Sequence, residues 1–385
     1  MRNKVELLAE GIRAAVQSGA GAVYMGFGMF NARRNAQGFS HDEMADAIAY
    51  CRARDVKTNI TLNILAGDRE LEDALEDAKF LYEAGADALI IQDLGLARLI
   101  HAHAPDFALH ASTQMTIHTL DAAKQARDIG FSRVVLSREC SREEIKLITE
   151  QAGVETEVFV HGALCMCYSG QCYLSAVIGQ RSGNRGLCAQ PCRLPYSGGY
   201  PLSLKDLMLA GHVAELSDWG VSSLKIEGRM KTALYVATVA RTYRKAIDDY
   251  KKDQALYRKN MEWYKEEIGK CTYREFTTGF YFGKPGSDAQ IYNSNTYVKN
   301  YTYLGTVEEA DGKGRCRIEQ KNKFSVGETI EIMKPDGRNL EVVVKSICDE
   351  DGNEQESAPH PKQILWVDLG ADVDKYDILR KKEDN

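Results

Sequence analysis

The stretch Ala84-Gly85-Ala86-Asp87-Ala88-Leu89-Ile90-Ile91-Gln92-Asp93 contains the unit from which the first part of the chain is built. A glycine ends an amphipathic segment, and a short apolar run follows that finishes in polar residues, as a buried strand after a helix does. The unit recurs up to residue 230, so we expect strands at residues 5–8, 22–26, 56–63, 88–93, 108–114, 134–138, 158–162 and 223–228. Alternating strands and helices predict an α/β fold, a parallel (β/α)8 TIM-like barrel.

Short β-rich runs replace this pattern after a long helical stretch at residues 235–270. They are separated by Gly, Asp, Asn and Pro and lie at residues 301–307, 314–318, 328–333, 340–347 and 363–367. Asp336-Gly337 and Asp351-Gly352 are typical of hairpin turns. We therefore predict a barrel at 1–275, with a cysteine-rich insertion at about 162–200 and a helical extension, and a C-terminal antiparallel β-rich domain at 276–385.

The composition is that of a soluble globular protein. Of the 385 residues, 44% are hydrophobic and 27% are charged, which excludes a mostly disordered chain. No apolar run approaches the roughly 18 residues of a membrane span, and the first residues lack the apolar core of a signal peptide. We expect a cytoplasmic protein with no membrane partner. The net charge of −6 excludes binding of polyanions through bulk charge, but it does not exclude a local basic patch.

Polar side chains recur where the expected strands end, which is the face of a barrel that carries the active site. The loop after the strand at 22–26 adds Arg33 and Arg34. The alternative is a set of ordinary polar turns, but large polar residues at so many strand ends favour a site. These strand-end residues are Asn63, Gln92, Asp93, Ser112, Gln114, Arg138, Glu139, His161, Glu227 and Arg229.

Five of the ten cysteines lie between Cys165 and Cys192, just past the seventh expected strand. In a reducing compartment such a cluster binds metal more often than it forms disulfides. Cys165, Cys172, Cys188 and Cys192 have the spacing C-x6-C-x15-C-x3-C. Four thiolates suit zinc or an iron–sulfur cluster, and the wide first pair favours the cluster. Cys167 is then a bystander or an alternate ligand, and the alternative for each cysteine is a small buried hydrophobe.

Three arginines, Arg181, Arg185 and Arg193, accompany these cysteines. A guanidinium forms paired hydrogen bonds with carboxylate or phosphate, so a small dicarboxylate and an RNA backbone would both fit. The alternative is a loop of solvated charges.

The cysteine-rich segment also resembles a known family, the U32 "peptidase" or collagenase-like proteins. Its signature is matched by residues 157–175, which include His161-Gly162-Ala163-Leu164-Cys165, and by Arg181-Ser182-Gly183-Asn184-Arg185-Gly186-Leu187-Cys188-Ala189-Gln190-Pro191-Cys192-Arg193. Further similar segments lie at 31–35, 202–207, 225–231, 278–283 and 358–361, so the resemblance covers essentially the whole chain. The segments after Ala9 and after Tyr196 are shorter than in the family.

The resemblance implies a barrel with an appended β domain, in an oxygen-adding enzyme with a [4Fe–4S] cluster. The chain looks most like the bacterial branch that makes 5-hydroxyuridine at the tRNA wobble position with prephenate as co-substrate. By motif match, Cys165, Cys172, Cys188 and Cys192 would hold the cluster. The expected partners are the tRNA anticodon loop, prephenate, and a second copy or a related U32 chain.

Roles for other residues follow from this expectation. Arg33, Arg34, Arg181 and Arg185 are candidates for binding the carboxylates of prephenate or RNA phosphates, and Tyr168 for stacking on a base. His161 and Glu227 are candidates for proton transfer, because both groups can exchange protons near neutral pH.

Two alternatives come from other function classes. The first is the collagenase-like peptidase of the family label, although the sequence contains neither an HExxH helix nor a G-x-S-x-G elbow, and only a Cys165–His161 pair is conceivable. The second is a non-catalytic RNA-binding module with a structural zinc.

Overall fold

The computed structural model describes residues 3–32, 38–228, 231–294 and 297–383. The chain forms two compact units. Unit 1 comprises residues 1–12, 21–230 and 274–296, and unit 2 comprises residues 13–20, 231–273 and 297–385.

Unit 1 is built on a nine-stranded sheet. Strands β1 to β6 pair in parallel and in chain order, β8 pairs in parallel with β6, and β7 pairs antiparallel with β6 and in parallel with β9. The strands are β1 (Ala22–Gly26), β2 (Lys57–Leu62), β3 (Ala88–Ile91), β4 (Ala108–Ala111), β5 (Arg133–Val135), β6 (Glu155–Ala163), β7 (Asp206–Met208), β8 (Ser223–Ile226) and β9 (Phe276–Thr277).

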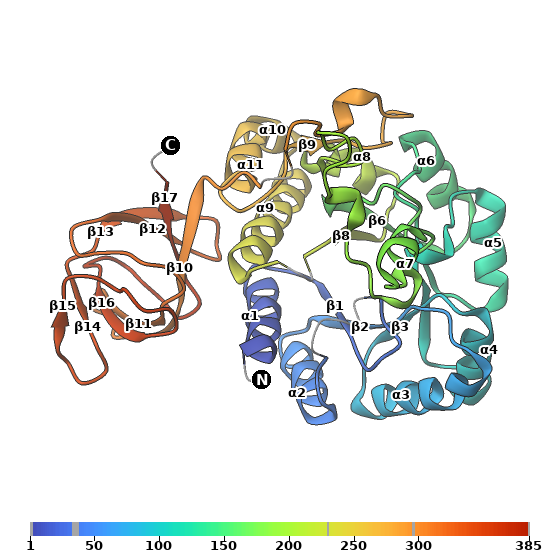
Figure 1. Ribbon diagram of the computed structural model, residues 1–385, viewed down its shortest axis with the longest axis horizontal. Coiled ribbons are helices and arrows are strands. Elements are labelled where there is room, and N and C mark those ends of the chain that lie inside the picture. Colours follow the sequence, from blue (N-terminus) through green and yellow to red (C-terminus); the bar gives the residue numbers. More distant parts are fainter. Residues whose placement is uncertain (1–2, 33–37, 229–230, 295–296, 384–385) are drawn as a thin grey trace. The chain divides into compact units, whose positions relative to one another are not determined.

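The helices that connect β1 to β6 lie around the outside of this sheet (Figure 1). Gly85, with φ of 80°, ends the helix before β3, and its backbone N–H bonds to the carbonyls of Leu81 and Tyr82. Ser40 and Ser141 begin two other helices with capping boxes. The helices are α1 (Asn3–Gln17), α2 (His41–Arg52), α3 (Leu71–Ala84), α4 (Leu94–His103), α5 (Leu120–Ile129), α6 (Arg142–Gln151), α7 (Leu174–Gly179) and α8 (Val213–Asp218).

Side chains in the interior of the barrel connect β8 to β1 and to β6. The ammonium of Lys225 on β8 lies 4.4 Å from the centre of the Tyr24 ring on β1 and forms an ion pair with Glu157 on β6. Strands β1, β6 and β8 therefore share one interior. This arrangement confirms the predicted TIM-like α/β fold.

The expected first strand, at residues 5–8, is wrong because these residues lie within α1. Residues 3–17 contain no proline and most of them are good helix formers, so the helix continues past Gly11 to Gln17. The other seven expected strands correspond to β1–β6 and β8.

Unit 2 combines three helices with an eight-stranded antiparallel sheet of order β13-β12-β17-β10-β11-β16-β14-β15, which confirms the predicted β-rich module. Asp336-Gly337 joins β12 to β13 and Asp351-Gly352 joins β14 to β15, as the turn signals predict. The elements are α9 (Ala233–Lys252), α10 (Gln254–Lys259), α11 (Met261–Ile268), β10 (Tyr301–Ala310), β11 (Arg315–Glu319), β12 (Thr329–Met333), β13 (Asn339–Val343), β14 (Ser346–Cys348), β15 (Glu354–Gln355), β16 (Ile364–Asp368) and β17 (Ile378–Lys382).

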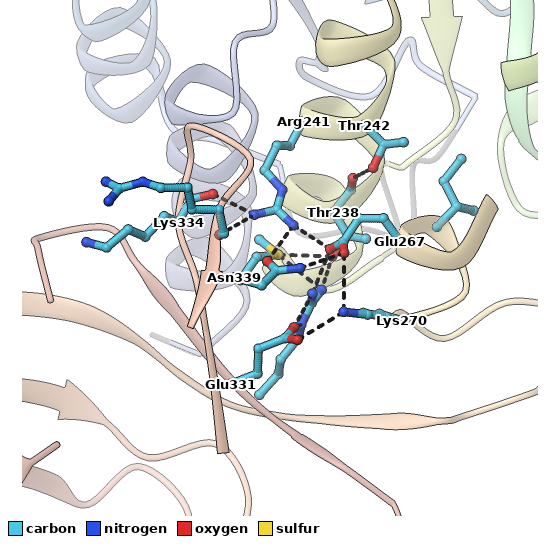
Figure 2. Close-up of polar contacts among 12 residues, drawn as sticks. Thr238, Arg241, Thr242, Glu267, Lys270, Glu331, Lys334 and Asn339 are labelled. Atoms are coloured by element: carbon cyan, nitrogen blue, oxygen red, sulfur yellow. Dashed lines mark hydrogen bonds and ion pairs between the residues drawn. The ribbon is translucent and has the colours of Figure 1, made fainter. Parts of the chain in front are cut away.

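A buried group of charged side chains joins these helices to the sheet (Figure 2). Glu267 on α11 accepts hydrogen bonds from Arg241 on α9 and from Arg380 on β17. Arg380 also pairs with Glu331 on β12, and Lys270 lies 2.9 Å from the same carboxylate. We call these five residues the charged network. It explains why the helical extension groups with the β-rich sheet.

The bounds of the two units therefore differ from the predicted domains 1–275 and 276–385. Residues 231–273 belong with the β-rich sheet, whereas residues 274–296 return to the barrel, where β9 pairs with β7. In the described part of the chain, no helix combines the length and the apolar character needed to cross a bilayer.

Candidate active site at the mouth of the barrel

Four polar residues follow the ends of β2, β3 and β4 and are buried there: Asn63, Gln92, Ser112 and Gln114. The Asn63 amide donates to the Ser112 hydroxyl at 3.2 Å, and the backbone N–H of Gln114 donates to the same hydroxyl, also at 3.2 Å. The Gln92 amide donates to the backbone carbonyl of Gln114 at 3.3 Å. Gln171, from the cysteine-rich insertion, donates to that carbonyl at 3.1 Å. We call these five residues the amide ladder.

Other polar strand-end residues have structural roles. The Asp93 carboxylate caps α4 by accepting from the backbone N–H of Leu96 at 2.9 Å, and it also accepts from the N–H of Ala66. Glu139 accepts a hydrogen bond from the Ser137 hydroxyl. The polar residues at the strand ends are therefore of two kinds, those that cap a helix and those that lie in the mouth of the barrel. The sequence alone does not distinguish the two kinds.

A second polar group surrounds Arg138, which follows β5. Its guanidinium donates to the carbonyl of Ala163 at 2.8 Å, lies 3.7 Å from the Glu227 carboxylate and covers the face of the Phe159 ring. The backbone N–H of Glu227 donates to the carbonyl of His161 at 2.9 Å. The structure thus joins the backbones of the two predicted proton-transfer residues and places Arg138 beside the carboxylate of Glu227.

A glycine permits this close approach. Gly162 has φ of 113°, and a Cβ atom there would lie 2.7 Å from the carbonyl oxygen of Glu227. Any side chain at this position would push the end of β8 away from β6. The neighbouring His161 is buried, and its ring lies 5.5 Å from the ring of Phe276. Cys165, with which His161 could form a catalytic pair in a peptidase, is exposed.

Deeper on β6, Glu157 forms a buried ion pair that the sequence analysis missed. It pairs with Lys225 and, at 3.3 Å, with Arg133. Burial alone would raise the pKa of Glu157, but Lys225 and Arg133 outweigh it and lower this pKa to about 2. Burial, aided by the charge of Arg133, lowers the pKa of His110 to about 4, so this imidazole is neutral at pH 7.

The cysteine-rich insertion runs between β6 and β7 and contains α7. Cys192 lies within electrostatic range of Cys165, Cys172 and Cys188, and burial together with these thiols raises the pKa of Cys192. Backbone N–H groups of Leu174 and Gln190 point to the sulfurs of Cys172 and Cys188 at 3.4 and 3.3 Å. The structure therefore gathers the four predicted ligands in one region.

Gly183 and Cys167 also belong to the region of the four predicted ligands. A Cβ atom at Gly183 would lie 3.3 Å from the carbonyl of Cys172 and 3.6 Å from Cβ of Cys188. Cys167 lies close enough to Cys172 and Cys165 for their thiols, together with burial, to raise the pKa of Cys167. All ten cysteines are free.

The donor set admits two kinds of inorganic group. Four thiolates suit either a tetrahedral zinc ion or an iron–sulfur cluster. Within the described residues, no three His, Cys, Asp or Glu side chains meet as ligands of a single metal ion.

The predicted anion-binding residues have different surroundings. Arg185 is held by both carboxylate oxygens of Glu70, and Arg193 is buried and donates to the carbonyls of Leu164 and Leu204. Arg181 is exposed, and its side chain donates from Nε to the carbonyl of Leu187 at 3.1 Å. Tyr168 is half-exposed and stacks on His118. Arg33 and Arg34 lie outside the described residues.

Two protein-family models together match nearly the whole chain. The model of peptidase family U32 matches residues 8–291, and that of the peptidase family U32 C-terminal domain matches residues 299–380. The tRNA hydroxylation protein P1 of Bacillus subtilis is 35% identical over 98% of this chain and 95% of its own length.

Two other relatives carry different names. A 23S rRNA 5-hydroxycytidine synthase of Escherichia coli is 41% identical, over 61% of this chain and 37% of its own. A collagenase of Porphyromonas gingivalis is 31% identical, over 82% of this chain and 85% of its own. These matches confirm the resemblance seen in the motifs, and the chain belongs to peptidase family U32.

Proposed function

We propose that this protein hydroxylates the wobble uridine of tRNA to 5-hydroxyuridine, with prephenate as co-substrate and a [4Fe–4S] cluster on Cys165, Cys172, Cys188 and Cys192. One observation carries the proposal: Gln171, which precedes Cys172, donates to the carbonyl of Gln114. This contact attaches the cysteine-rich insertion to the mouth of the barrel, where barrel enzymes bind their substrates. The names of two relatives, a tRNA hydroxylation protein and an rRNA hydroxycytidine synthase, support the same reaction class.

The donor set supports the cluster. Three free thiols lie within electrostatic range of Cys192, and two of these sulfurs already accept backbone N–H groups, which tune cluster potentials in proteins. When bound, the cluster would supply redox or Lewis-acid chemistry that side chains lack. The chain's own residues then hold the substrate and move protons, with Glu227 and His161 in that role beside Arg138.

Charge and aromatic exposure support RNA as the substrate. From Val158 to Lys205 the sequence contains no Asp or Glu, although the chain has a net charge of −6. Tyr168 and Tyr173 are exposed in this segment, and Arg181 presents its guanidinium to solvent. Exposed aromatic rings with nearby cations are typical of surfaces that bind unpaired bases. A wobble base lies in a single-stranded loop, so moving it into the mouth costs little.

The arginines support a place for the carboxylates of prephenate. A guanidinium binds a carboxylate through paired hydrogen bonds. Arg181 is available for this role, whereas Arg185 would first have to release Glu70. We assign Arg33 and Arg34 to the same role on the family motif alone.

Mass spectrometry of tRNA tests the proposal. A bacterial strain lacking its own uridine-hydroxylating enzyme is complemented with the wild-type chain, with Cys188→Ala, or with Cys51→Ala. Cys51 is fully buried in α2 and serves as the matched control. We expect 5-hydroxyuridine-derived nucleosides with the wild type and the control but not with Cys188→Ala. Undiminished product from Cys188→Ala would contradict the cluster, and no product from the wild-type chain would contradict the function.

A second measurement identifies the bound group directly. Protein purified without oxygen should contain iron and acid-labile sulfide in near-equal amounts. Zinc without iron or sulfide in the wild-type protein would support the structural-zinc alternative instead.

A further inference from the structure

Two glutamine side chains of the amide ladder are buried and each presents an amide oxygen with no hydrogen-bond partner in the described chain. Gln92 is 8% exposed and Gln114 is 5% exposed, and the unpartnered atom is Oε1 in both. A buried acceptor without a donor costs about 1–3 kcal/mol. The mouth of the barrel therefore favours a ligand that brings N–H or O–H groups to these oxygens.

The orientation of the Gln92 amide is fixed by its other end. Its Nε2 donates to the backbone carbonyl of Gln114 at 3.3 Å. Turning the amide over would lose this bond and place two oxygen atoms against each other. Gln92 therefore presents an acceptor, not a donor, to whatever occupies the mouth.

An unpartnered amide oxygen is not by itself a binding site, as Gln320 in unit 2 shows. Its Nε2 also donates to a backbone carbonyl, that of Ala358 at 2.9 Å, and its Oε1 also lacks a partner among the described residues. Gln320 directly follows β11 in the β-rich sheet of unit 2, beside Gln363, whose Oε1 also lacks a partner in the described chain. Gln92 and Gln114 instead meet at one carbonyl, at the end of the barrel where ligands bind, beside the insertion that carries the cysteines.

The chemistry of an acceptor restricts the ligand. A carboxylate or phosphate placed against these oxygens would be repelled, because it has no hydrogen to donate. The amide ladder therefore does not suit an anionic co-substrate, which the arginines would bind instead. A uracil ring has a single ring donor, N3–H, and the nucleotide adds its 2′-hydroxyl.

We propose that Gln92 selects the substrate base by accepting the N3–H of the target uridine, with the amide oxygen of Gln114 as a second acceptor for the same nucleotide. This inference rests on the proposed function. Gln114 also acts through its backbone, because its carbonyl holds the Gln92 amide in place, and Gln171 is a positioning residue that binds the same carbonyl.

Binding of two synthetic RNAs tests the proposal without any catalytic readout. The probes are an anticodon stem–loop with uridine at the wobble position and the same RNA with 3-methyluridine, which lacks the N3–H. We expect the full-length wild-type protein to bind the uridine probe about tenfold more tightly, because one buried hydrogen bond is lost with the methylated base. Gln92→Ala removes the acceptor and leaves room for the methyl group, so its ratio of the two affinities should approach one. Gln320→Ala, the matched control, should keep the wild-type ratio.

The outcomes separate this inference from the function on which it rests. If the wild type binds both RNAs equally, or if Gln92→Ala keeps the tenfold ratio, the role of Gln92 is overturned while RNA binding stands. The wild-type comparison needs no substitution and so remains decisive if Gln92→Ala fails to fold. If the wild type binds neither RNA, the proposed function fails and the inference fails with it.

Discussion

Buried polar side chains occur in both units, but they are arranged differently. In the charged network of unit 2, Arg241 and Arg380 are at most 2% exposed and share the carboxylate of Glu267 (Figure 2). Arg241 also donates to the backbone carbonyl of Lys334 and, at 3.0 Å, to the side chain of Asn339. At the mouth of the barrel, by contrast, Gln92 and Gln114 keep unpartnered oxygens, and Arg138 stands 3.7 Å from Glu227.

The difference separates structural from functional polarity. In the charged network each charge has an opposite charge beside it, and Arg241 Nε is a buried donor without a hydrogen-bond partner in the described chain. The mouth retains unused hydrogen-bonding capacity, which a ligand would fill. The Glu157–Lys225 pair shows that the same contrast exists within the barrel, because this pair is buried and complete only a few residues before His161 on the same strand.

The largest effect should come from breaking the charged network. Glu267→Gln leaves two arginines buried without a full counter-charge, so we expect the free energy of unfolding to fall by about 3–5 kcal/mol. Urea denaturation followed by tryptophan fluorescence measures this. Glu262→Gln, on the exposed face of α11, is the control and should change stability by less than about 0.5 kcal/mol. Equal, small losses in both variants would mean that the network does not hold the helices to the sheet.

Acid should weaken both complete ion-pair groups together. Burial raises the pKa of Glu267, but Arg380 and Arg241 outweigh it and lower this pKa to about 2, and the pKa of Glu157 is also about 2. In the unfolded chain both groups titrate near their ordinary value of about 4.3. Their contribution, on the order of 3 kcal/mol each, is therefore present above pH 4.3 and is lost as the pH falls toward 2.

Unfolding experiments across this pH window check the acid prediction. Stability of the wild type should rise with pH between about 2 and 4.3, because the unfolded chain binds more protons there. Glu157→Gln should have a shallower slope in the same window. An unchanged slope would mean that Glu157 is not held ionised by Lys225.

How far the sequence predicts this fold depends on the length of each element. The runs at 88–93 and 158–162 are apolar enough to be recognised, and they lie in β3 and β6. β7 and β9 have three and two residues, too few for any periodicity, and neither can be predicted from its sequence. The prediction of a strand at residues 5–8 is wrong because a short apolar run has the same composition in a strand and in a helix.

The site could be predicted only in part for a related reason. The cysteine spacing and the family motif identified the insertion, but Asp93 and Gln92 are equivalent polar residues in sequence, and only the structure shows that one caps a helix and the other enters the mouth. Partners far apart in the chain were also hidden. Arg241, Glu267 and Arg380 carry no local signal of their pairing, so the grouping of the helices with the β-rich sheet could not be foreseen.

Substitution at the mouth should sharpen the contrast by affecting activity more than stability. Glu227→Gln keeps the size of the side chain but removes its proton-accepting charge, so we expect at least about a hundredfold loss in the rate of tRNA hydroxylation. The loss in stability should be smaller than that of Glu267→Gln, because the Glu227 carboxylate lies 3.7 Å from one arginine whereas Glu267 bonds directly to two. Glu155→Gln, which breaks an exposed pair with Arg133, is the control for rate. A large loss of stability in Glu227→Gln with little loss of rate would assign Glu227 to the structural class.

The smallest effect concerns the arginines of the insertion, where one guanidinium has a carboxylate partner and the other does not. Arg181→Ala should weaken binding of the anticodon stem–loop severalfold and reduce the slope of log K against log salt by about 1, as expected for one phosphate contact. Arg185→Ala should change the slope less, since Glu70 already neutralises Arg185. Arg98→Ala, an exposed arginine on α4, should leave the slope unchanged. A larger change for Arg185 than for Arg181 would show that RNA displaces Glu70, and the Arg185–Glu70 pair would then belong to the binding surface and not to the framework of the insertion.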